Sequence, residues 1–299
     1  MFIELGKEYK ELYRHQSTYN SIQVFETIYN HKLLVCDGIV QVHEGDEYRY
    51  HECLAIVPYL FTHHARNILI VGGGDGLCAK QLFRFPIDSI TIVEIDPEIP
   101  KICKTFINGS EAFENKKVKI IHQDAIDFVS DVKYELIICD LTDPSHEYSA
   151  RLYTFEYLEH LKSMLTKDGT IATQAVGPLY QPKAFWCLYN TYIKAFPEYN
   201  VLAYKCFLPF VVTQIGFIMA TPNPISVQIP EDLKYIDNFN FSSLFSMDKD
   251  ERIMSQTIIG NKDYVSTKDN LMYANLFEKP YLNNIKEFDL EKRTRHART

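Results

Sequence analysis

Apolar and polar residues follow different patterns before and after about residue 58. Three short segments before this point, 21–28, 32–38 and 39–45, are rich in residues that favour strands, and Asp37-Gly38 and Glu44-Gly45 are turn signals. We therefore expect residues 1–57 to form a small antiparallel β domain.

From residue 58 onward, apolar strands alternate with helical segments. Strands are predicted at NILIVGGG, SITIVEID, KVKIIHQD, YELIICD, GTIATQAV and QIGFIMAT, and helices at LCAKQLFRF, PEIPKICKTFI and YTFEYLEHLKSML. Strands that are apolar throughout are typical of a sheet covered by helices on both faces. We therefore expect an α/β domain with a doubly wound sheet over residues 58–299. Residues 222–299, which begin with a proline-rich connector, are expected to extend this domain and to end in a frayed basic tail.

Bulk composition and charge exclude several functions. The 299 residues carry a net charge of −8, which disfavours nucleic-acid binding because that binding depends on neutralising phosphates with Lys and Arg. An acidic cleft would instead concentrate a cationic substrate. No apolar run approaches the roughly 18 residues that a membrane span needs, and the first residues lack a signal-peptide pattern. The seven scattered cysteines contain no CxxC pair, so we expect reduced thiols, no metal site and a cytoplasmic protein.

A glycine-rich turn follows the strand at 68–71. The glycines of Gly72-Gly73-Gly74-Asp75-Gly76 let the backbone turn tightly and approach a ligand closely. Glu94 closes the next strand, about 20 residues further on, where an acidic residue can bind ribose hydroxyls. A tight turn without a ligand is the plain alternative, but the complete strand–glycine–helix–strand–acid unit favours a nucleotide site.

Asp75 distinguishes between two classes of nucleotide. A pyrophosphate would lie at the glycine turn and helix N-terminus, where the Asp75 carboxylate would repel it, whereas a sulfonium or an amine would be attracted. An S-adenosyl compound is therefore favoured over a dinucleotide. Asp124 follows the third strand and can accept a hydrogen bond from an adenine amino group or cap the next helix. Both roles can hold together.

A second acidic cluster, Asp140 and Asp143, follows the strand YELIIC. Ligands of open α/β sheets bind beyond the carboxyl ends of the strands, so we expect a ring of carboxylates around one crevice, formed by Asp75, Glu94, Asp124, Asp140 and Asp143. One carboxylate can take the proton of an attacking amine, and another can hold a distant ammonium group. A turn before Pro144 would explain a single aspartate, but not five carboxylates at one sheet edge.

Eight segments together resemble the spermidine synthase (aminopropyltransferase) family, over residues 15–221. They are DEYRYHE (46–52), ILIVGGGDG (68–76), VEID (93–96), QDAIDF (123–128), DLTDP (140–144), LYTFEYLEHLKSML (152–165), TQAVGPLY (173–180) and QIGFIMAT (214–221). The resemblance implies an N-terminal β unit followed by a Rossmann-like, methyltransferase-type domain. It also implies transfer of the aminopropyl group of decarboxylated S-adenosylmethionine to a polyamine, release of 5′-methylthioadenosine, and a homodimer or homotetramer.

The resemblance further implies roles for individual residues. Asp140 is expected to be the general base, with Asp143 holding the substrate ammonium, Tyr50 positioning the amine and Gln174 near the acceptor. Asp75 would bind the aminopropyl ammonium of the donor and Glu94 its ribose. The other expected nucleotide contacts are Asn20, His51, Gly72, Gly74, Asp124 and Ala125.

Two departures from the family pattern concern the substrates. Asn20 stands where the family usually has a longer Gln that touches the nucleotide. The segment LPFVVTQIGF (208–217) replaces a Tyr-Pro-Ser-Gly stretch, which removes a tyrosine that binds putrescine. The segments around DLTDP and TQAVGP look more like the thermospermine synthase and agmatine/triamine branch. We therefore expect an acceptor longer than putrescine, such as spermidine or agmatine.

Two other functions are compatible with the same scaffold. An N-methyltransferase would use ordinary S-adenosylmethionine, whose carboxylate would meet Asp75 and Asp140, and juxtaposed like charges are unfavourable at a desolvated contact. A non-catalytic polyamine or nucleotide binder would be expected to have lost Asp140 or Tyr50, and both are present. The sequence therefore favours aminopropyl transfer.

Overall fold

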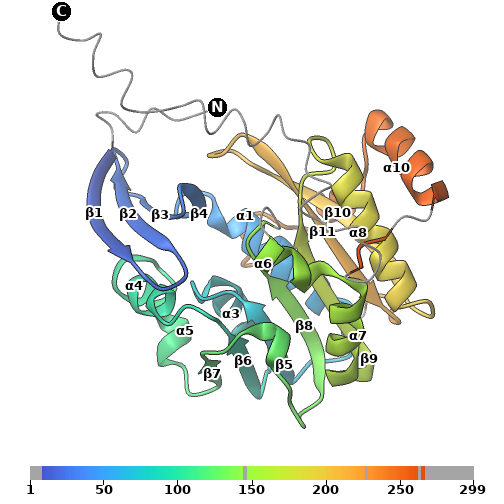
Figure 1. Cartoon of the computed structure of the whole chain (residues 1–299), viewed down its shortest axis with the longest axis horizontal. Coiled ribbons are helices and arrows are strands. Elements are labelled where there is room, and N and C mark those ends of the chain that lie inside the picture. The colour runs from blue at the N-terminus through green and yellow to red at the C-terminus, as the bar shows by residue number, and fades with distance from the viewer. Residues whose placement is uncertain (1–8, 144–146, 226–227, 262–263, 267–299) are drawn as a thin grey trace, which may run out of the picture.

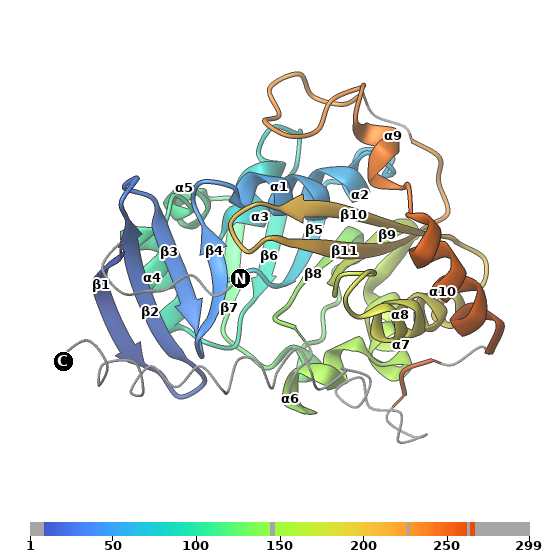
Figure 2. The ribbon, with the colours of Figure 1, turned by 90° about the horizontal axis from the view of Figure 1, so that it is seen from above.

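The structure, a computed structural model, describes residues 9–143, 147–225, 228–261 and 264–266. Within this part of the chain the strands form two sheets, one of four strands and one of seven. The four-stranded sheet lies at one end of the molecule and the seven-stranded sheet forms its centre (Figures 1 and 2). The predicted fold class, an antiparallel β unit followed by a Rossmann-like α/β sheet, is confirmed.

The N-terminal sheet is an antiparallel meander in the order β1-β2-β3-β4. Its strands are β1 (Tyr9–Gln16), β2 (Ser21–Thr27), β3 (Lys32–Cys36) and β4 (Ile39–His43). The last three match the predicted strands. β1 was not predicted, because its sequence YKELYRHQ is mostly charged or polar and no residue of it is fully buried. The apolar face of the sheet packs against α4 (Glu98–Phe106), through Ile22, Val24 and Leu34.

A continuous helical segment follows, made of α1 (Glu47–His51), a π-helical turn (Glu52–Ile56) and α2 (Val57–Tyr59). The expectation that residues 1–57 consist only of strands and turns is therefore wrong for the part after residue 46. Residues 53–57 are fully buried, and a helix that is apolar all round belongs in a core. The division into domains 1–57 and 58–299 stays a prediction.

The central sheet has the order β10-β11-β9-β8-β5-β6-β7. Five strands run parallel: β5 (Asn67–Gly72), β6 (Ser89–Val93), β7 (Val118–Ile121), β8 (Tyr134–Asp140) and β9 (Leu165–Ala175). The hairpin of β10 (Asn200–Leu208) and β11 (Thr213–Thr221) adds to β9 antiparallel. β10 was not predicted. The turn that joins it to β11 is too short for a crossover, so this pair has to be antiparallel.

Helices cover both faces of the central sheet (Figure 2). Besides those above, they are α3 (Leu77–Leu82), α5 (Ser110–Glu114), α6 (Glu147–Ala150), α7 (Phe155–Met164), α8 (Pro182–Ala195), α9 (Phe241–Leu244) and α10 (Lys249–Asn261), with 3-10 turns at Ala125–Asp127 and Arg151–Tyr153. α7 and α8 pack on Leu69, Val71 and Ile137. The helical segment 52–59 and α3 pack on Ile68, Ile70 and Ile138. Successive strand residues point to opposite faces, which explains why β5 and β8 are apolar throughout.

The C-terminal extension is attached to the core through Glu52. This buried carboxylate accepts hydrogen bonds from the backbone N–H groups of Lys234, Tyr235 and Ile236, at 2.8, 3.0 and 3.0 Å. The predicted basic tail lies outside the described residues. Among the residues that the structure describes, no helix combines the length and the apolar character of a membrane span.

Candidate active site

The crevice at the carboxyl ends of β5 and β8 is the place where the strand order reverses. β6 and β7 extend the sheet on one side of β5, and β8 and β9 extend it on the other. Open α/β sheets bind ligands at such a switch point. Gly72 at the end of β5 lies opposite Asp140 at the end of β8, and the N–H of Gly73 donates to the Asp140 carbonyl at 3.0 Å. The glycine turn and Asp140 are therefore joined.

The glycine turn requires glycine at two positions because atoms of neighbouring strands occupy the space that a side chain would need. Gly72 has a φ of +78°, and a Cβ there would lie 2.0 Å from the backbone oxygen of Asp140. A Cβ on Gly74 would lie 2.6 Å from Oε2 of Glu94. Both glycines thus allow acidic residues of neighbouring strands to reach the crevice.

Two adjoining cavities open at this crevice. The smaller, of about 120 Å³, is lined by residues that include Asn20, Tyr50, Gly74, Asp75, Glu94 and Asp140. The larger, of about 540 Å³, is lined by residues that include Tyr50, His51, Asp143 and Gln174, together with Asp37, Asp46 and Glu47. Asn20 and Tyr50 line both cavities. Among the described residues that line them, every charged side chain apart from histidine is a carboxylate.

Asp140 lines the smaller cavity, and the next two residues, Leu141 and Thr142, line both cavities. The hydroxyl of Tyr50 donates to Oδ1 of Asp140 at 2.8 Å, whereas Oδ2 is buried and no nitrogen or oxygen of the described residues donates to it. Burial and the charge of Asp75 raise the pKa of Asp140 to about 6, against the opposing effects of His51, Tyr50 and Cys78. A carboxylate that is ionised at neutral pH but has a raised proton affinity is suited to accept a proton.

His51 lies between two carboxylates. Its Nδ1 is 2.7 Å from Oε2 of Glu47 and 2.8 Å from the Glu47 carbonyl, and its Nε2 is 3.7 Å from Oδ2 of Asp75. Burial opposes a charged imidazole, but the interactions with Asp75 and Glu47 raise the pKa of His51 well above its usual value. Glu47 was not among the predicted site residues, although its spacing of one helical turn from His51 is visible in DEYRYHE.

Glu94 lines the smaller cavity and is held by the turn that follows it. Its Oε1 accepts from the N–H of Asp96 at 2.8 Å. Burial raises the pKa of Glu94 to about 7, against the effect of this hydrogen bond. Asp96, which sequence reasoning missed, accepts from the Asn20 side-chain amide at 2.8 Å. Asn20 thus lines the cavity while its amide is engaged with the protein.

Asp124 and Ala125 line neither cavity. Oδ1 of Asp124 accepts from the N–H of Ile126 at 3.1 Å, so the predicted capping role is confirmed. Its Oδ2 forms an ion pair with Arg151 that the sequence did not reveal. The expected ring around one crevice therefore includes Asp75, Glu94, Asp140 and Asp143, while Asp124 lies outside it. The adenine contact of Asp124 stays a prediction.

Gln174 at the end of β9 connects three elements beside the larger cavity. Its side-chain amide donates to the Leu141 carbonyl at 2.8 Å, to the Tyr153 hydroxyl at 3.0 Å and to Oδ1 of Asp143 at 3.3 Å. Burial raises the pKa of Asp143, and the Gln174 hydrogen bond opposes the shift. Gln174 therefore orients Asp143 at the wall of the cavity.

Contacts between the two sheets close the far end of the larger cavity. The ring of His43 stacks on Phe210 with centroids 3.8 Å apart, and Nδ1 of His43 is 2.9 Å from Oδ1 of Asp46. Oδ2 of Asp46 accepts from the N–H of Phe210 at 2.7 Å. Phe210 belongs to the segment expected to have lost the putrescine-binding tyrosine, and its contacts connect the β10–β11 turn to β4.

Comparison with known proteins agrees with this architecture. The sequence pattern of the spermine/spermidine synthase domain matches residues 47–229. A polyamine aminopropyltransferase of Thermoplasma volcanium is 35% identical over 198 residues, which cover 65% of this chain and 71% of that protein. The thermospermine synthase ACAULIS5 of Arabidopsis thaliana is 30% identical over 257 residues, which cover 80% of this chain and 75% of that protein.

Solved spermidine synthases share the fold. One in complex with the transition-state analogue AdoDATO superposes with a TM-score of 0.76 at 22% identity, covering 83% of this chain and 89% of that one. The enzyme of Thermotoga maritima gives a TM-score of 0.73 at 22% identity, covering 83% and 87%. The domain match spans the helical segment and every strand of the central sheet, including the glycine turn, Tyr50 and Asp140, so the chain belongs to the spermine/spermidine synthase family.

Proposed function

We propose that this protein transfers the aminopropyl group of decarboxylated S-adenosylmethionine to a polyamine longer than putrescine and releases 5′-methylthioadenosine. The observation that supports this most directly is the position of Asp140, which lines the smaller acidic cavity and accepts a hydrogen bond from Tyr50, a residue that lines both cavities. The relatives named polyamine aminopropyltransferase and thermospermine synthase support the same reaction class.

The smaller cavity is lined by groups that suit the ribose and the aminopropyl chain of the donor, and its volume of about 120 Å³ matches only that part of the nucleotide, because pockets for whole ligands of this size are roughly 300 Å³ or more. Glu94 can accept hydrogen bonds from the ribose hydroxyls, and the backbone at Gly74 is open to close approach. Asp75 can hold the ammonium of the aminopropyl group and favours a sulfonium nearby. Ordinary S-adenosylmethionine would place a carboxylate against Asp75 and Asp140, which is unfavourable in a desolvated site. The donor proposed is therefore the decarboxylated compound.

Asp140 is proposed as the general base. The acceptor amine is protonated at neutral pH, because an alkyl amine has a pKa of about 10.4, and it has to lose a proton before or during attack. As the nitrogen bonds to the carbon beside the sulfonium, the carbon–sulfur bond breaks, and the electron pair leaves with a neutral thioether. The amine proton passes to Asp140, so no acid is needed to expel the leaving group.

The larger cavity suits a long acceptor. Its volume of about 540 Å³ extends from Tyr50 to the His43–Phe210 stack, and its walls include Asp37, Asp46, Glu47 and Asp143. Carboxylates spaced along a cavity can hold several ammonium groups of one chain. We therefore propose a triamine such as spermidine, or agmatine, as the acceptor, with Asp143 and Gln174 nearest the reacting amine.

Product analysis by mass spectrometry tests the proposal. The protein is incubated with decarboxylated S-adenosylmethionine and, in parallel, with putrescine, agmatine, spermidine or norspermidine. We expect 5′-methylthioadenosine and an amine enlarged by one aminopropyl group with a long acceptor, and much less product with putrescine. Preferential reaction with putrescine would refute the acceptor assignment. Formation of S-adenosylhomocysteine from ordinary S-adenosylmethionine would favour the N-methyltransferase alternative.

We further propose a cytoplasmic homodimer or homotetramer. All seven cysteines are buried thiols outside any disulfide, as expected for a reducing compartment, and a net charge of −8 disfavours nucleic acid as a partner. Light scattering coupled to size exclusion would measure the oligomeric state, and a monomer at micromolar concentration would contradict this part of the proposal.

A further inference from the structure

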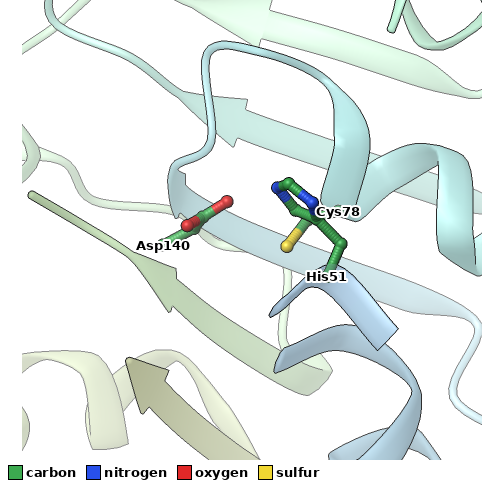
Figure 3. Close-up of side chains that lie close together, drawn as sticks. All are labelled: His51, Cys78 and Asp140. Atoms are coloured by element: carbon green, nitrogen blue, oxygen red, sulfur yellow. The ribbon is translucent and has the colours of Figure 1, made fainter. Parts of the chain in front are cut away.

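We propose that His51, Cys78 and Asp140 form an inhibitory binding site for a thiophilic divalent cation, with Zn²⁺ as the ion that fits them best. The three side chains come from α1, the first turn of α3 and the end of β8, and they point toward one another (Figure 3). One ligand atom from each lies within 4.8 Å of the others. Their distance in the sequence explains why cysteine spacing gave no indication of a metal site.

The donor set matches the preferences of zinc. An imidazole nitrogen, a thiolate sulfur and a carboxylate oxygen are all common zinc ligands, with bonds of about 2.0 to 2.3 Å. Donors around a tetrahedral zinc lie roughly 3.5 Å apart at such bond lengths, so the three side chains have to close by about 1 Å. Oδ2 of Asp75, at 3.7 Å from Nε2 of His51, can supply a fourth ligand or leave that position to water.

The groups behind the ligands are arranged as in a metal site. Nδ1 of His51 is held by Glu47, which directs Nε2 toward Cys78 and Asp140. A metal-binding histidine usually has its second nitrogen fixed by a carboxylate or a carbonyl in this way. Tyr50 likewise holds Oδ1 of Asp140, and among the described residues no nitrogen or oxygen donates to the buried Oδ2. Glu47 and Tyr50 thus already hold two of the three ligands, and the ligand atoms face one another.

The negative charge around the three ligands favours a bound dication over the protons that the ligands otherwise carry. Asp75, Asp140 and Glu47 place three carboxylates around His51. Zinc would replace the protons on Nε2 and on the Cys78 thiol, because only the deprotonated groups are ligands. Cys78 is fully buried, and its thiol lies close enough to Asp140 to donate a hydrogen bond to it. No substrate contact is assigned to this thiol.

Binding at this position would stop aminopropyl transfer. A zinc ion on Asp140 takes the electron pair that would accept the amine proton, and its charge repels the ammonium and sulfonium groups of both substrates. This consequence depends on the proposed role of Asp140, whereas the binding of the ion does not. The protein would then be sensitive to free zinc, although the transfer reaction proposed above uses no metal.

Cobalt absorption spectroscopy on the substrate-free full-length chain tests the site directly. We expect one equivalent of Co²⁺ to give a tetrahedral spectrum with a thiolate-to-cobalt charge-transfer band, and Zn²⁺ to abolish it. Cys78→Ala should lose the band. Cys139→Ala should keep it, because Cys139 precedes Asp140 on β8 but packs on the opposite face of the sheet. A charge-transfer band that persists in Cys78→Ala, or is absent from the wild type, would overturn the proposal.

Two further measurements test the sulfur ligand and the inhibition by zinc separately. X-ray absorption of the zinc-loaded wild type, which needs no variant, should show one sulfur at about 2.3 Å among nitrogen and oxygen ligands; a shell without sulfur would exclude Cys78. In activity assays, the zinc concentration that halves the rate should rise at least tenfold in Cys78→Ser. Equal zinc sensitivity in wild type and Cys78→Ser, with sulfur present in the shell, would refute the inhibitory role.

Discussion

Single carboxylates at the crevice gain proton affinity from burial. Asp140 and Glu94 have pKa values raised to about 6 and about 7, and both lie near the charge of Asp75. The same environment that suits proton transfer also makes the ionised groups unfavourable in the folded protein. Chemistry and stability are therefore opposed at these residues, and the two effects can be measured separately.

Asp140 and Asp143 are expected to affect different kinetic constants. Asp140→Asn keeps the shape and can still accept from Tyr50, but it cannot take a proton, so kcat should fall by about 10²- to 10⁴-fold. Binding of 5′-methylthioadenosine should change little. Asp143→Asn is the matched comparison and should mainly raise KM for the acceptor. Steady-state kinetics and calorimetry separate these effects, and an Asp140→Asn enzyme with normal kcat would remove Asp140 as the base.

Tyr50 should determine the acid limb of the pH profile. Its hydrogen bond stabilises the ionised form of Asp140, so Tyr50→Phe should raise the Asp140 pKa and move the acid limb of kcat/KM to higher pH. A hydrogen bond to a charged group is worth about 1.5 kcal/mol or more, and one pH unit corresponds to about 1.4 kcal/mol, so the expected shift is about one unit.

The Tyr50→Phe variant should therefore lose more activity at pH 6 than at pH 8. Tyr48→Phe, on the same helix, is the control, because Tyr48 lies by Lys234 and not at Asp140. An unchanged acid limb with a uniformly lower rate would mean that Tyr50 only positions the substrate.

Glu94→Gln should stabilise the free protein while weakening donor binding. Because the folded pKa of Glu94 is raised from 4.5 to about 7, the folded state binds the proton more tightly, and its stability falls as pH rises between these values. The variant lacks this penalty, so its free energy of unfolding should exceed that of the wild type by on the order of 1 to 3 kcal/mol at pH 8.

The stability difference between Glu94→Gln and wild type should disappear near pH 4. Denaturant titrations at pH 4, 6 and 8 measure the trend, with exposed Glu111→Gln as the control. Calorimetry with 5′-methylthioadenosine should show weaker binding to Glu94→Gln. Unchanged affinity would contradict the ribose assignment, and a pH-independent stability difference would contradict the linkage.

At the scale of elements, the sequence predicted those strands and turns that have a clear apolar periodicity or characteristic turn residues. The apolar runs of β5 and β8 required burial on both faces, and the glycine turn required a close approach, which the structure places at Asp140 and Glu94. β1 was missed because its sequence is mostly charged or polar, and β10, NVLAYKCFL, was missed although it is mostly apolar, because an apolar run of that length does not by itself distinguish a strand from a buried helix. The helical residues before position 58 were missed because an apolar run of that length fits a strand or a buried helix equally well.

Two alanine substitutions in the glycine turn should affect different properties, one the stability of the fold and the other the binding of the nucleotide. In Gly72→Ala, the positive φ and a Cβ 2.0 Å from the Asp140 backbone oxygen leave no room, so stability should fall by at least about 1–2 kcal/mol. In Gly74→Ala, the three atoms nearest the new Cβ, at 2.6 to 2.9 Å, belong to the Glu94 side chain and not to the backbone, so they can move aside. Gly74→Ala should therefore fold with a nearly normal Tm but bind 5′-methylthioadenosine weakly. Equal loss of Tm in both variants would contradict this distinction.

At the scale of the whole molecule, the site combines residues from distant segments, and nothing in the sequence of one segment indicates which other segment it contacts. Asn20 lies on the N-terminal sheet segment and Tyr50 on the helical segment, while Asp140 ends a central strand. The resemblance of short motifs predicted these residues, but contacts such as Arg151–Asp124 and Asp46–Phe210 join distant segments through side chains that look ordinary in the sequence. They depend on how the two sheets and the C-terminal extension pack, which periodicity does not specify.

The contact between the two sheets should control acceptor binding alone. His43, Asp46 and Phe210 wall the larger cavity, and none of them lines the smaller one. His43→Ala removes the stack on Phe210, and aromatic pairs are worth about 0.5 to 1.5 kcal/mol. With the loss of the Asp46 contact, KM for a long amine should rise about tenfold. KM for decarboxylated S-adenosylmethionine should be unchanged, because the donor cavity keeps its walls.

His31→Ala provides a matched control for this substitution. His31 packs edge-on against His43, with centroids 5.4 Å apart, but lines neither cavity. It should therefore leave both KM values near those of the wild type. If His43→Ala raised both KM values equally, the sheet contact would support the fold as a whole. A rise for the long acceptor alone would mean that the N-terminal sheet contributes to acceptor selection through the β10–β11 turn.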